Sequence, residues 1–153
     1  MPLWSRIPPR VAESHHAFGL LDTSVVIDLE RVDPACLPAA LAVSAVTLAE
    51  LAAGPHATGD VDERARRQER LQRVEATFDP LPFDGAAARA YGRVYAAVAA
   101  AGRKTRGRRA LDLLIAATAL AGSLPLYTRN PADFAEVTDL VDIVPVPTVA
   151  RSN

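Results

Sequence analysis

Four acidic residues stand in short, mostly apolar stretches that lie far apart in the chain: Asp22, Glu50, Asp112 and Asp133. Carboxylates that meet would repel one another by about 4 kcal/mol per close pair at an intermediate effective dielectric. A divalent cation reverses that repulsion, and Mg²⁺ prefers hard oxygen ligands while it keeps several waters. A cation held in this way can activate water for in-line attack on phosphorus. The acids therefore suggest metal-dependent phosphodiester hydrolysis, with Mg²⁺ as the expected ion and Mn²⁺ as the alternative.

Each acid also has a purely local interpretation. Asp22 precedes a run of helix-starting residues and would serve as an N-cap. Glu50 would mark the solvent-facing stripe of its helix. Asp112, in the first turn of a helix, would interact favourably with the helix dipole, and Asp133 would support a helix that starts after Asn130. These interpretations stay open at the level of single residues.

Short apolar segments that alternate with helical patterns must position these acids. Helical patterns cover residues 23–29, 44–54, 84–102, 110–120 and 131–137, and residues 60–78 read as a largely exposed helix that flanks the core. Strands are expected at 17–21, 41–43, 124–128 and 141–146, with a further short one at 81–83. Strands of this kind, apolar on both sides, predict an α/β fold: a three-layer α/β/α domain around a short central parallel sheet.

The end of the first expected strand is where chemistry is expected. In an open parallel sheet, ligands bind beyond the carboxyl ends of the strands, where the following helices begin. Asp22 directly follows the strand at 17–21. We therefore expect its side chain to project into a crevice at that edge of the sheet.

Composition restricts the class of protein. The chain has 153 residues, half of them apolar, 23% charged residues and a formal net charge of -1, which indicates one compact domain and excludes a uniformly basic surface. We expect a flexible leader at 1–16, the domain at 17–147 and a tail at 148–153. No stretch has the length of a membrane span and the first residues lack the apolar block of a secretion signal, so a cytoplasmic location is expected. Cys36 is the single cysteine, so no internal disulfide can form.

A basic segment precedes the Asp112 helix and has two interpretations. It would either hold an RNA backbone, so that binding weakens with salt, or form a plain solvated loop. The candidate RNA-binding residues are Arg103, Lys104, Arg106 and Arg108, with Arg109 next to them.

Five strings in this order resemble a PIN domain of the VapC toxin type, across nearly the whole chain from about Leu20. They are LLDTSVVIDL, VSAVTLAELAAG, LPFDGAAARAYG, ALDLLIAATALA and LYTRNPADF. The resemblance implies that Asp22, Glu50 and Asp112 bind the metal and that Asp133 is the fourth acid. It also implies supporting polar roles for Thr23, Thr128 and Asn130, with Asn130 an alternative to Asp133 as the group that completes the site.

The same resemblance implies an endoribonuclease that attacks structured or single-stranded RNA, such as transfer RNA. It implies a homodimer and a cognate antitoxin protein that covers the site and inhibits it. The alternative is a catalytically silent PIN-like module that binds RNA or protein, which the intact Asp22, Glu50 and Asp112 disfavour. A phosphoaspartyl enzyme is also disfavoured, because Ser24 stands where the dehalogenase-like group needs a second aspartate.

Overall fold

The computed structural model describes residues 16–147, so the expected tail and all but the last residue of the expected leader lie outside the described residues. Four strands form one sheet in the order β2-β1-β3-β4, and every neighbouring pair is parallel. The strands are β1 (Phe18–Leu21), β2 (Ala40–Val43), β3 (Leu126–Thr128) and β4 (Ile143–Pro145). The α-helices are α2 (Thr23–Ile27), α3 (Ala45–Ala53), α4 (Val61–Thr77), α5 (Gly85–Ala100) and α6 (Arg108–Ala121). Short 3₁₀ helices are η2 (Leu29–Arg31), η3 (Pro34–Cys36), η4 (Gly54–Ala57) and η5 (Pro131–Val137).

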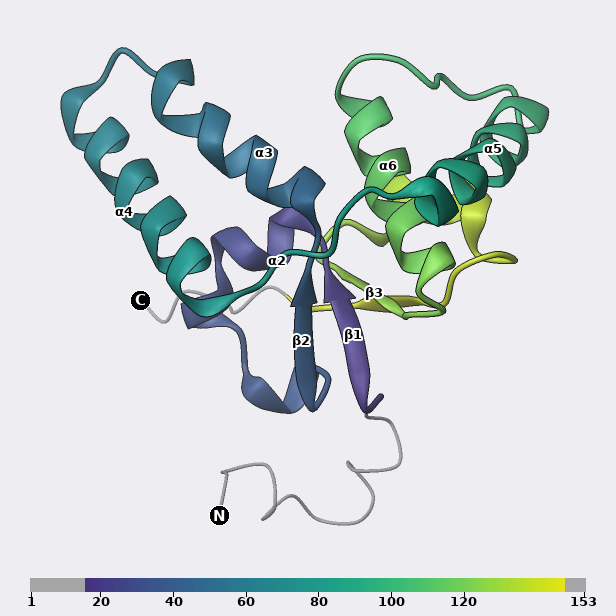
Figure 1. Cartoon of the computed structure of the whole chain (residues 1–153), viewed down its shortest axis with the longest axis horizontal. Coiled ribbons are helices and arrows are strands. Elements are labelled where there is room, and N and C mark those ends of the chain that lie inside the picture. The colour runs from purple at the N-terminus through teal and green to yellow at the C-terminus, as the bar shows by residue number, and fades with distance from the viewer. Residues whose placement is uncertain (1–15, 148–153) are drawn as a thin grey trace.

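Alternate strand residues face opposite sides of the sheet, so each strand contributes to two cores. Leu20 pairs with Leu126 and belongs to the cluster formed with α5, α6 and η5. Leu21 pairs with Val43 and Tyr127 and belongs to the cluster formed with α2, α3 and α4. Figure 1 shows these two groups of helices on either side of the strands. The predicted three-layer α/β/α architecture is confirmed, and it explains why the strands are apolar on both faces.

Side-chain caps fix where the helices begin. Asp60 Oδ1 accepts a hydrogen bond from Glu63 N at 2.8 Å at the start of α4. Asp84 Oδ1 accepts one from Ala87 N at 3.0 Å at the start of α5. Both caps satisfy amide groups that the first helical turn leaves without partners.

Some elements are shorter than the sequence predicts, such as α2, β3 and β4, and three further differences affect how the elements begin or pack. The predicted strand at 81–83 is a single bridge between Leu81 and Ser44. The helix predicted at 110–120 begins earlier, at Arg108, because Gly107 adopts a φ of +67° and turns the chain just before it. The helix α4 is more than an exposed flank, since Leu71 and Val74 are buried in the core beside α2 and α3.

Within residues 16–147, none of the helices is both long and apolar enough to cross a membrane.

Candidate active site

Asp22 lies at the carboxyl end of β1 and is only 4% exposed. Its carboxylate caps α2 by accepting a hydrogen bond from Val25 N at 3.2 Å. It also accepts hydrogen bonds from Ser24 Oγ and, at 2.6 Å, from Thr128 Oγ1. Asp22 is therefore both the helix cap of the local interpretation and a residue of the expected crevice.

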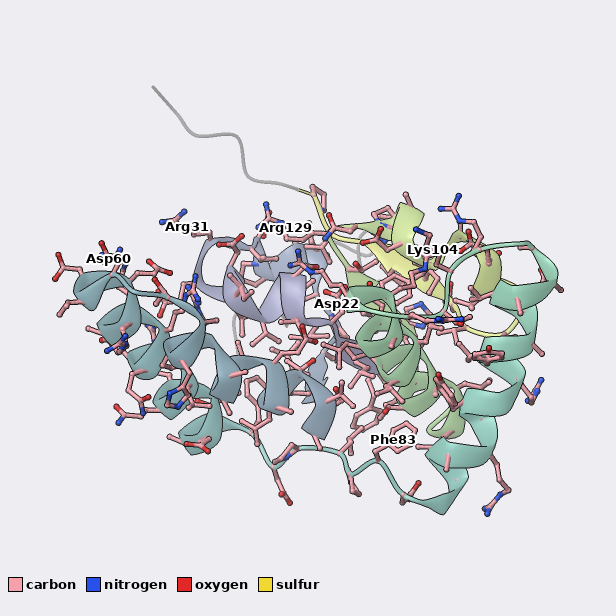
Figure 2. The ribbon with its side chains drawn as sticks, turned by 90° about the horizontal axis from the view of Figure 1, so that it is seen from above. Asp22, Arg31, Asp60, Phe83, Lys104 and Arg129 are labelled. Atoms are coloured by element: carbon pink, nitrogen blue, oxygen red, sulfur yellow. The ribbon has the colours of Figure 1, made fainter. Side chains whose placement is uncertain are left out.

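The crevice lies beside β1, where the order of the strands in the sheet reverses. The chain leaves β1 towards β2 on one side, whereas β3 and β4 lie on the other side of β1. Ligands of open parallel sheets bind at such a switch point. Asp22 follows β1 and Arg129 follows β3, and Figure 2 shows Asp22 near the centre of the molecule between the helices.

Glu50 reaches the same crevice from α3. Ser44 caps the start of this helix, because its side chain accepts a hydrogen bond from Thr47 N, and Glu50 lies less than one turn after Thr47. Thr23 Oγ1 donates a 2.7 Å hydrogen bond to Glu50 Oε1. Glu50 is partly buried and held by a neighbouring element, so the interpretation of a simple solvent-facing residue is wrong for it.

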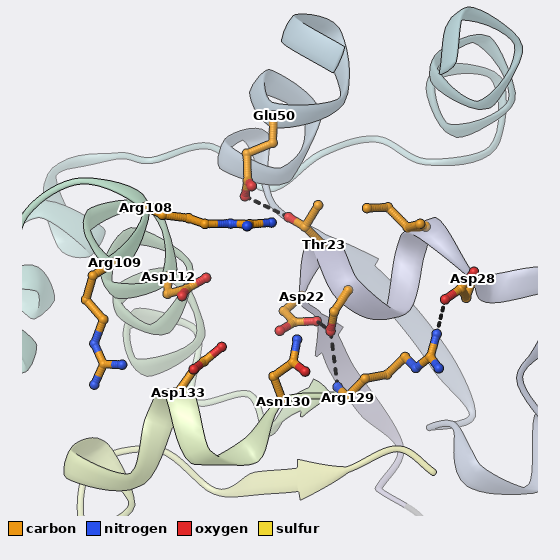
Figure 3. A pocket seen from close by; sticks show the side chains of 12 residues that line it. Asp22, Thr23, Asp28, Glu50, Arg108, Arg109, Asp112, Arg129, Asn130 and Asp133 are labelled. Carbon is orange, nitrogen blue, oxygen red and sulfur yellow. Dashed lines mark hydrogen bonds and ion pairs between the residues drawn. The ribbon is translucent and has the colours of Figure 1, made fainter. Parts of the chain in front are cut away.

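Asp112 and Asp133 complete a cavity of about 650 Å³ (Figure 3). Asp112 sits on the fifth residue of α6, so the interpretation that placed it in the first turn is wrong, and the first turn of α6 carries no acid. Asp133 does lie in the first turn of η5, as its local interpretation has it, and it lines the cavity as well. The cavity is lined by Asp22, Thr23, Ser24, Ile27, Asp28, Glu50, Arg108, Arg109, Asp112, Arg129, Asn130 and Asp133.

Asp112 is the acid whose ionisation the other carboxylates perturb. Burial is the largest cause that raises the pKa of Asp112 to about 6, and repulsion from Asp133, Asp22 and Glu50 follows. Arg109 acts in the opposite direction. Burial also raises the pKa of Asp22, while hydrogen bonds from Ser24 and Thr128 oppose that rise. A raised carboxyl pKa beside other carboxylates is a frequent mark of a functional site.

The basic residues before the Asp112 helix do not act alike. Arg108 lines the cavity, and in Figure 3 its side chain extends between Glu50 and Asp112. Arg109 also lines it, but its guanidinium pairs with Glu136 at 2.7 Å. Arg103 pairs with the same carboxylate at 2.9 Å. Lys104 and Arg106 are exposed on the loop between α5 and α6, outside the cavity lining.

The predicted supporting residues share the site in different ways. Thr23 bonds to Glu50, and Thr128 bonds to Asp22. Asn130 lines the cavity, and its backbone N–H donates to Thr128 Oγ1 at 3.0 Å. Asn130 occupies the N-cap position of η5, directly before Pro131, as the sequence predicts, although its side chain makes no cap hydrogen bond.

Sequence reasoning missed three contributors. Ser24 Oγ donates to Asp22 and accepts from Arg129 N at 3.1 Å, so it links the ends of β1 and β3. Arg129 lines the cavity and forms an ion pair with Asp28. Thr47 contacts Thr23 Oγ1 at 3.0 Å. Only Thr47 had a readable signal, because residues three apart on a helix share a face and Glu50 is three residues on.

The donor set fits a hard divalent cation. All four acids offer oxygen ligands around one cavity, and their mutual repulsion is what a cation would relieve. Within the part of the chain that the structure describes, no three His, Cys, Asp or Glu side chains are arranged closely enough to hold an ion by themselves. Mg²⁺ suits such a site, because it binds through one or two carboxylates and fills its shell with water and substrate phosphate.

Comparison with known proteins gives a consistent match. The family model described as the PIN domain matches residues 19–140. Ribonuclease VapC5 of Mycobacterium tuberculosis is 42% identical over 122 residues, which is 78% of this chain and 87% of that relative. Ribonuclease VapC8 of the same species is 38% identical over 110 residues, covering 71% and 96% of the two chains.

Solved structures agree with the sequence matches. A crystal structure of VapBC-5 from Mycobacterium tuberculosis, a member of the VapBC family of toxin-antitoxin systems, superposes with a TM-score of 0.75. Its sequence identity is 40%, and the match covers 85% of this chain and 99% of that one. The resemblance noted from the five sequence strings is therefore confirmed.

Proposed function

This chain belongs to the VapC branch of the PIN-domain family, and from that premise we propose that it is an endoribonuclease that hydrolyses phosphodiester bonds of RNA. The observation that carries the proposal is the meeting of Asp22, Glu50, Asp112 and Asp133 around one cavity at the carboxyl end of the sheet. The name of the curated relatives, ribonuclease VapC, supports the same activity.

Magnesium is the proposed cofactor, with manganese as a substitute. Asp22 and Asp112 would hold the ion, with Glu50 and Asp133 completing the acidic shell. Bound Mg²⁺ would lower the pKa of a coordinated water and offset the charge that develops during in-line attack on phosphorus.

The other residues of the site would position the acids and the substrate. Ser24 and Thr128 orient the Asp22 carboxylate by hydrogen bonds, which also favour its ionised form. Thr23 holds Glu50 in the same way. Arg108 extends into the cavity, where its guanidinium would bind a phosphate oxygen of the RNA. Arg103, Lys104 and Arg106 would contribute longer-range attraction for the backbone from the neighbouring loop.

The biological setting is proposed from the relatives. The solved VapBC-5 structure is described as a toxin-antitoxin system, and this supports a role as the toxin of such a pair. A cognate antitoxin would then cover the acidic cavity and inhibit cleavage. A homodimer, a cytoplasmic location and transfer RNA as a substrate class belong to the same proposal.

Cleavage of a labelled RNA by the purified protein tests the activity. We expect cleavage in Mg²⁺ or Mn²⁺, none in EDTA, and a loss of at least about 100-fold in Asp22→Asn, which keeps the shape of the side chain and removes its charge. Asp139→Asn is the control, because Asp139 is exposed and does not line the cavity. Equal cleavage in EDTA would reject the mechanism. RNA binding without cleavage, under all ions, would favour the catalytically silent module instead.

A further inference from the structure

A chain of hydroxyl groups connects the buried end of β2 to the acidic cavity, and we propose that Thr47 is a positioning residue that fixes Glu50 through Thr23. The chain consists of Ser44, Thr47 and Thr23, and it ends on the Glu50 carboxylate. The inference rests on the proposed function in one respect, which is that Glu50 serves as a metal ligand. The contacts themselves are features of the fold.

The distances define an unbroken path. Ser44 Oγ lies 3.3 Å from Thr47 Oγ1, and Thr47 Oγ1 lies 3.0 Å from Thr23 Oγ1. Thr23 Oγ1 lies 2.7 Å from Glu50 Oε1. Figure 3 shows the last of these contacts, in which Thr23 and Glu50 approach each other from α2 and α3. Ser44 and Thr47 are both completely buried, so water cannot replace any partner at that end.

Counting protons gives the path a direction. Each hydroxyl has a single proton to donate. Thr23 Oγ1 donates to Glu50 Oε1, so the Thr23 proton is used on Glu50. Thr23 Oγ1 must then accept from Thr47, which in turn accepts from Ser44. Every donor along the path therefore points towards Glu50, and successive hydrogen bonds of this kind strengthen one another.

Thr23 needs this support because its own helix does little to fix its side chain. In the middle of a helix, the preceding turn limits which χ1 rotamers a side chain can adopt. Thr23 is the first residue of α2, directly after the Asp22 cap, so no helical turn precedes it. The Thr47 hydroxyl supplies the missing constraint from α3. Glu50 is consequently held by a hydroxyl whose position is set by a buried residue outside the cavity lining.

Two substitutions at Thr47 distinguish the effect of losing its hydroxyl group from the effect of changing how its side chain packs. Thr47→Val keeps the shape and removes the donor, whereas Thr47→Ser keeps the donor and removes a methyl group. Thr118→Val is the matched control, because Thr118 is also a buried threonine but donates to Leu114 O within α6. Thermal unfolding of all three variants shows how much stability each substitution costs.

The first readout is spectroscopic and needs neither metal nor activity. Three-bond NMR couplings to the Thr23 methyl group report whether χ1 occupies one rotamer. We expect one rotamer in the wild-type protein, in Thr47→Ser and in Thr118→Val, and averaging in Thr47→Val. An averaged Thr23 in the wild-type protein would overturn the proposal, and this measurement does not depend on whether any variant folds.

The second readout is the affinity for Mn²⁺, measured by electron paramagnetic resonance. Changes in groups that orient metal ligands typically weaken binding by about 10- to 100-fold. Because Thr47 acts one hydroxyl further away, we expect a loss of about fivefold to tenfold in Thr47→Val, recovery in Thr47→Ser and no change in Thr118→Val. Wild-type affinity in Thr47→Val, or an equal loss in Thr47→Ser, would contradict the proposal.

The two proposals fail separately. A protein that binds Mn²⁺ but cleaves no RNA would contradict the proposed nuclease activity. The Mn²⁺ affinities and the Thr23 couplings would still test the positioning role of Thr47. A protein that cleaves RNA with Thr23 averaged between rotamers would contradict the role of Thr47 and leave the nuclease intact.

Discussion

Thr128 Oγ1 donates a 2.6 Å hydrogen bond to Asp22 Oδ2, which joins two residues 106 positions apart in the chain. The same oxygen accepts a hydrogen bond from Asn130 N at 3.0 Å. One buried hydroxyl therefore ties the end of β1 to the end of β3 and to the turn that leads to Asp133. The relative positions of the first and last acids depend on this contact as well as on the sheet.

Thr128→Val should show the effect of losing these hydrogen bonds without a large change in packing, because the two side chains have nearly the same shape. The variant leaves Asp22 with one donor fewer, and we expect the free energy of unfolding to fall by about 1–3 kcal/mol. Cleavage should fall by about tenfold or more, as for other groups that orient metal ligands. Urea unfolding and the rate of RNA cleavage measure the two effects. Thr128→Ser should keep most of both properties, and an equal loss in Thr128→Ser would show that packing is responsible.

The raised pKa of Asp112 gives stability a defined dependence on pH. Its pKa in the folded protein is about 6, against an ordinary value of 3.8, so the folded state binds this proton more tightly than the unfolded chain does. The contribution is fully present below the ordinary value and is lost as pH rises through the folded pKa. Asp112→Asn cannot ionise and should escape that loss. Its advantage in Tm over the wild-type protein should therefore be larger at about pH 7.5 than at about pH 5, without added metal.

Divalent metal should reverse this order. Mg²⁺ at about pH 7.5 should raise the Tm of the wild-type protein, because a ligand that binds only the folded state stabilises it. It should raise the Tm of Asp112→Asn much less. A difference in Tm between the two metal-free proteins that is the same at both pH values would show that the pKa of Asp112 is not raised in the folded protein.

Much of the architecture was readable from the sequence. Apolar segments bounded by acids and helix caps predicted the parallel sheet, and the rule for its carboxyl edge predicted that Asp22 would face a crevice. Alternation explains why this worked, since Leu20 and Leu21 face different cores and both must be apolar. Asp22 also shows that a local cap and a place in a crevice are compatible, since one carboxylate fills both roles.

The contacts between elements were not readable in the same way. Ser24 contacts Arg129 N only because β1 and β3 are neighbours in the sheet. The sequence of neither segment predicts that they are neighbours. Arg103 and Arg109 share Glu136, which lies on η5 and carried no signal in the sequence. The sequence of the basic segment therefore does not distinguish Arg108, which lines the cavity, from the paired and exposed basic residues beside it.

Gly19 tests how tightly β1 and β3 pack beneath the site. A Cβ atom at Gly19 would lie 2.5 Å from Tyr127 Cε2 and 2.8 Å from Pro38 Cγ. Tyr127 is buried, so its ring has little freedom to move away. We expect Gly19→Ala to lower the free energy of unfolding by about 1–3 kcal/mol.

The matched control for that substitution is Gly92→Ala. Gly92 lies within α5, and apart from the adjoining backbone of that helix no atom would lie within 4 Å of an added Cβ. Alanine there should raise stability by about 0.5–1 kcal/mol, because it costs less backbone entropy in a helix than glycine does. Urea unfolding of both variants measures the difference, and equal effects at the two positions would contradict the close packing at Gly19.

Arg108 should contribute more to RNA binding than an arginine remote from the cavity. Affinity is measured in the Asp22→Asn background, where RNA should stay intact, over a series of salt concentrations. Each phosphate contact adds about one unit to the slope of log affinity against log salt concentration. We expect Arg108→Ala to weaken binding and to reduce that slope by about 1, since its side chain extends among the acids where the scissile phosphate would lie. Arg93→Ala, at an exposed position on α5, should change the slope far less. If the two variants reduce the slope equally, the attraction comes from net charge and Arg108 holds no particular phosphate.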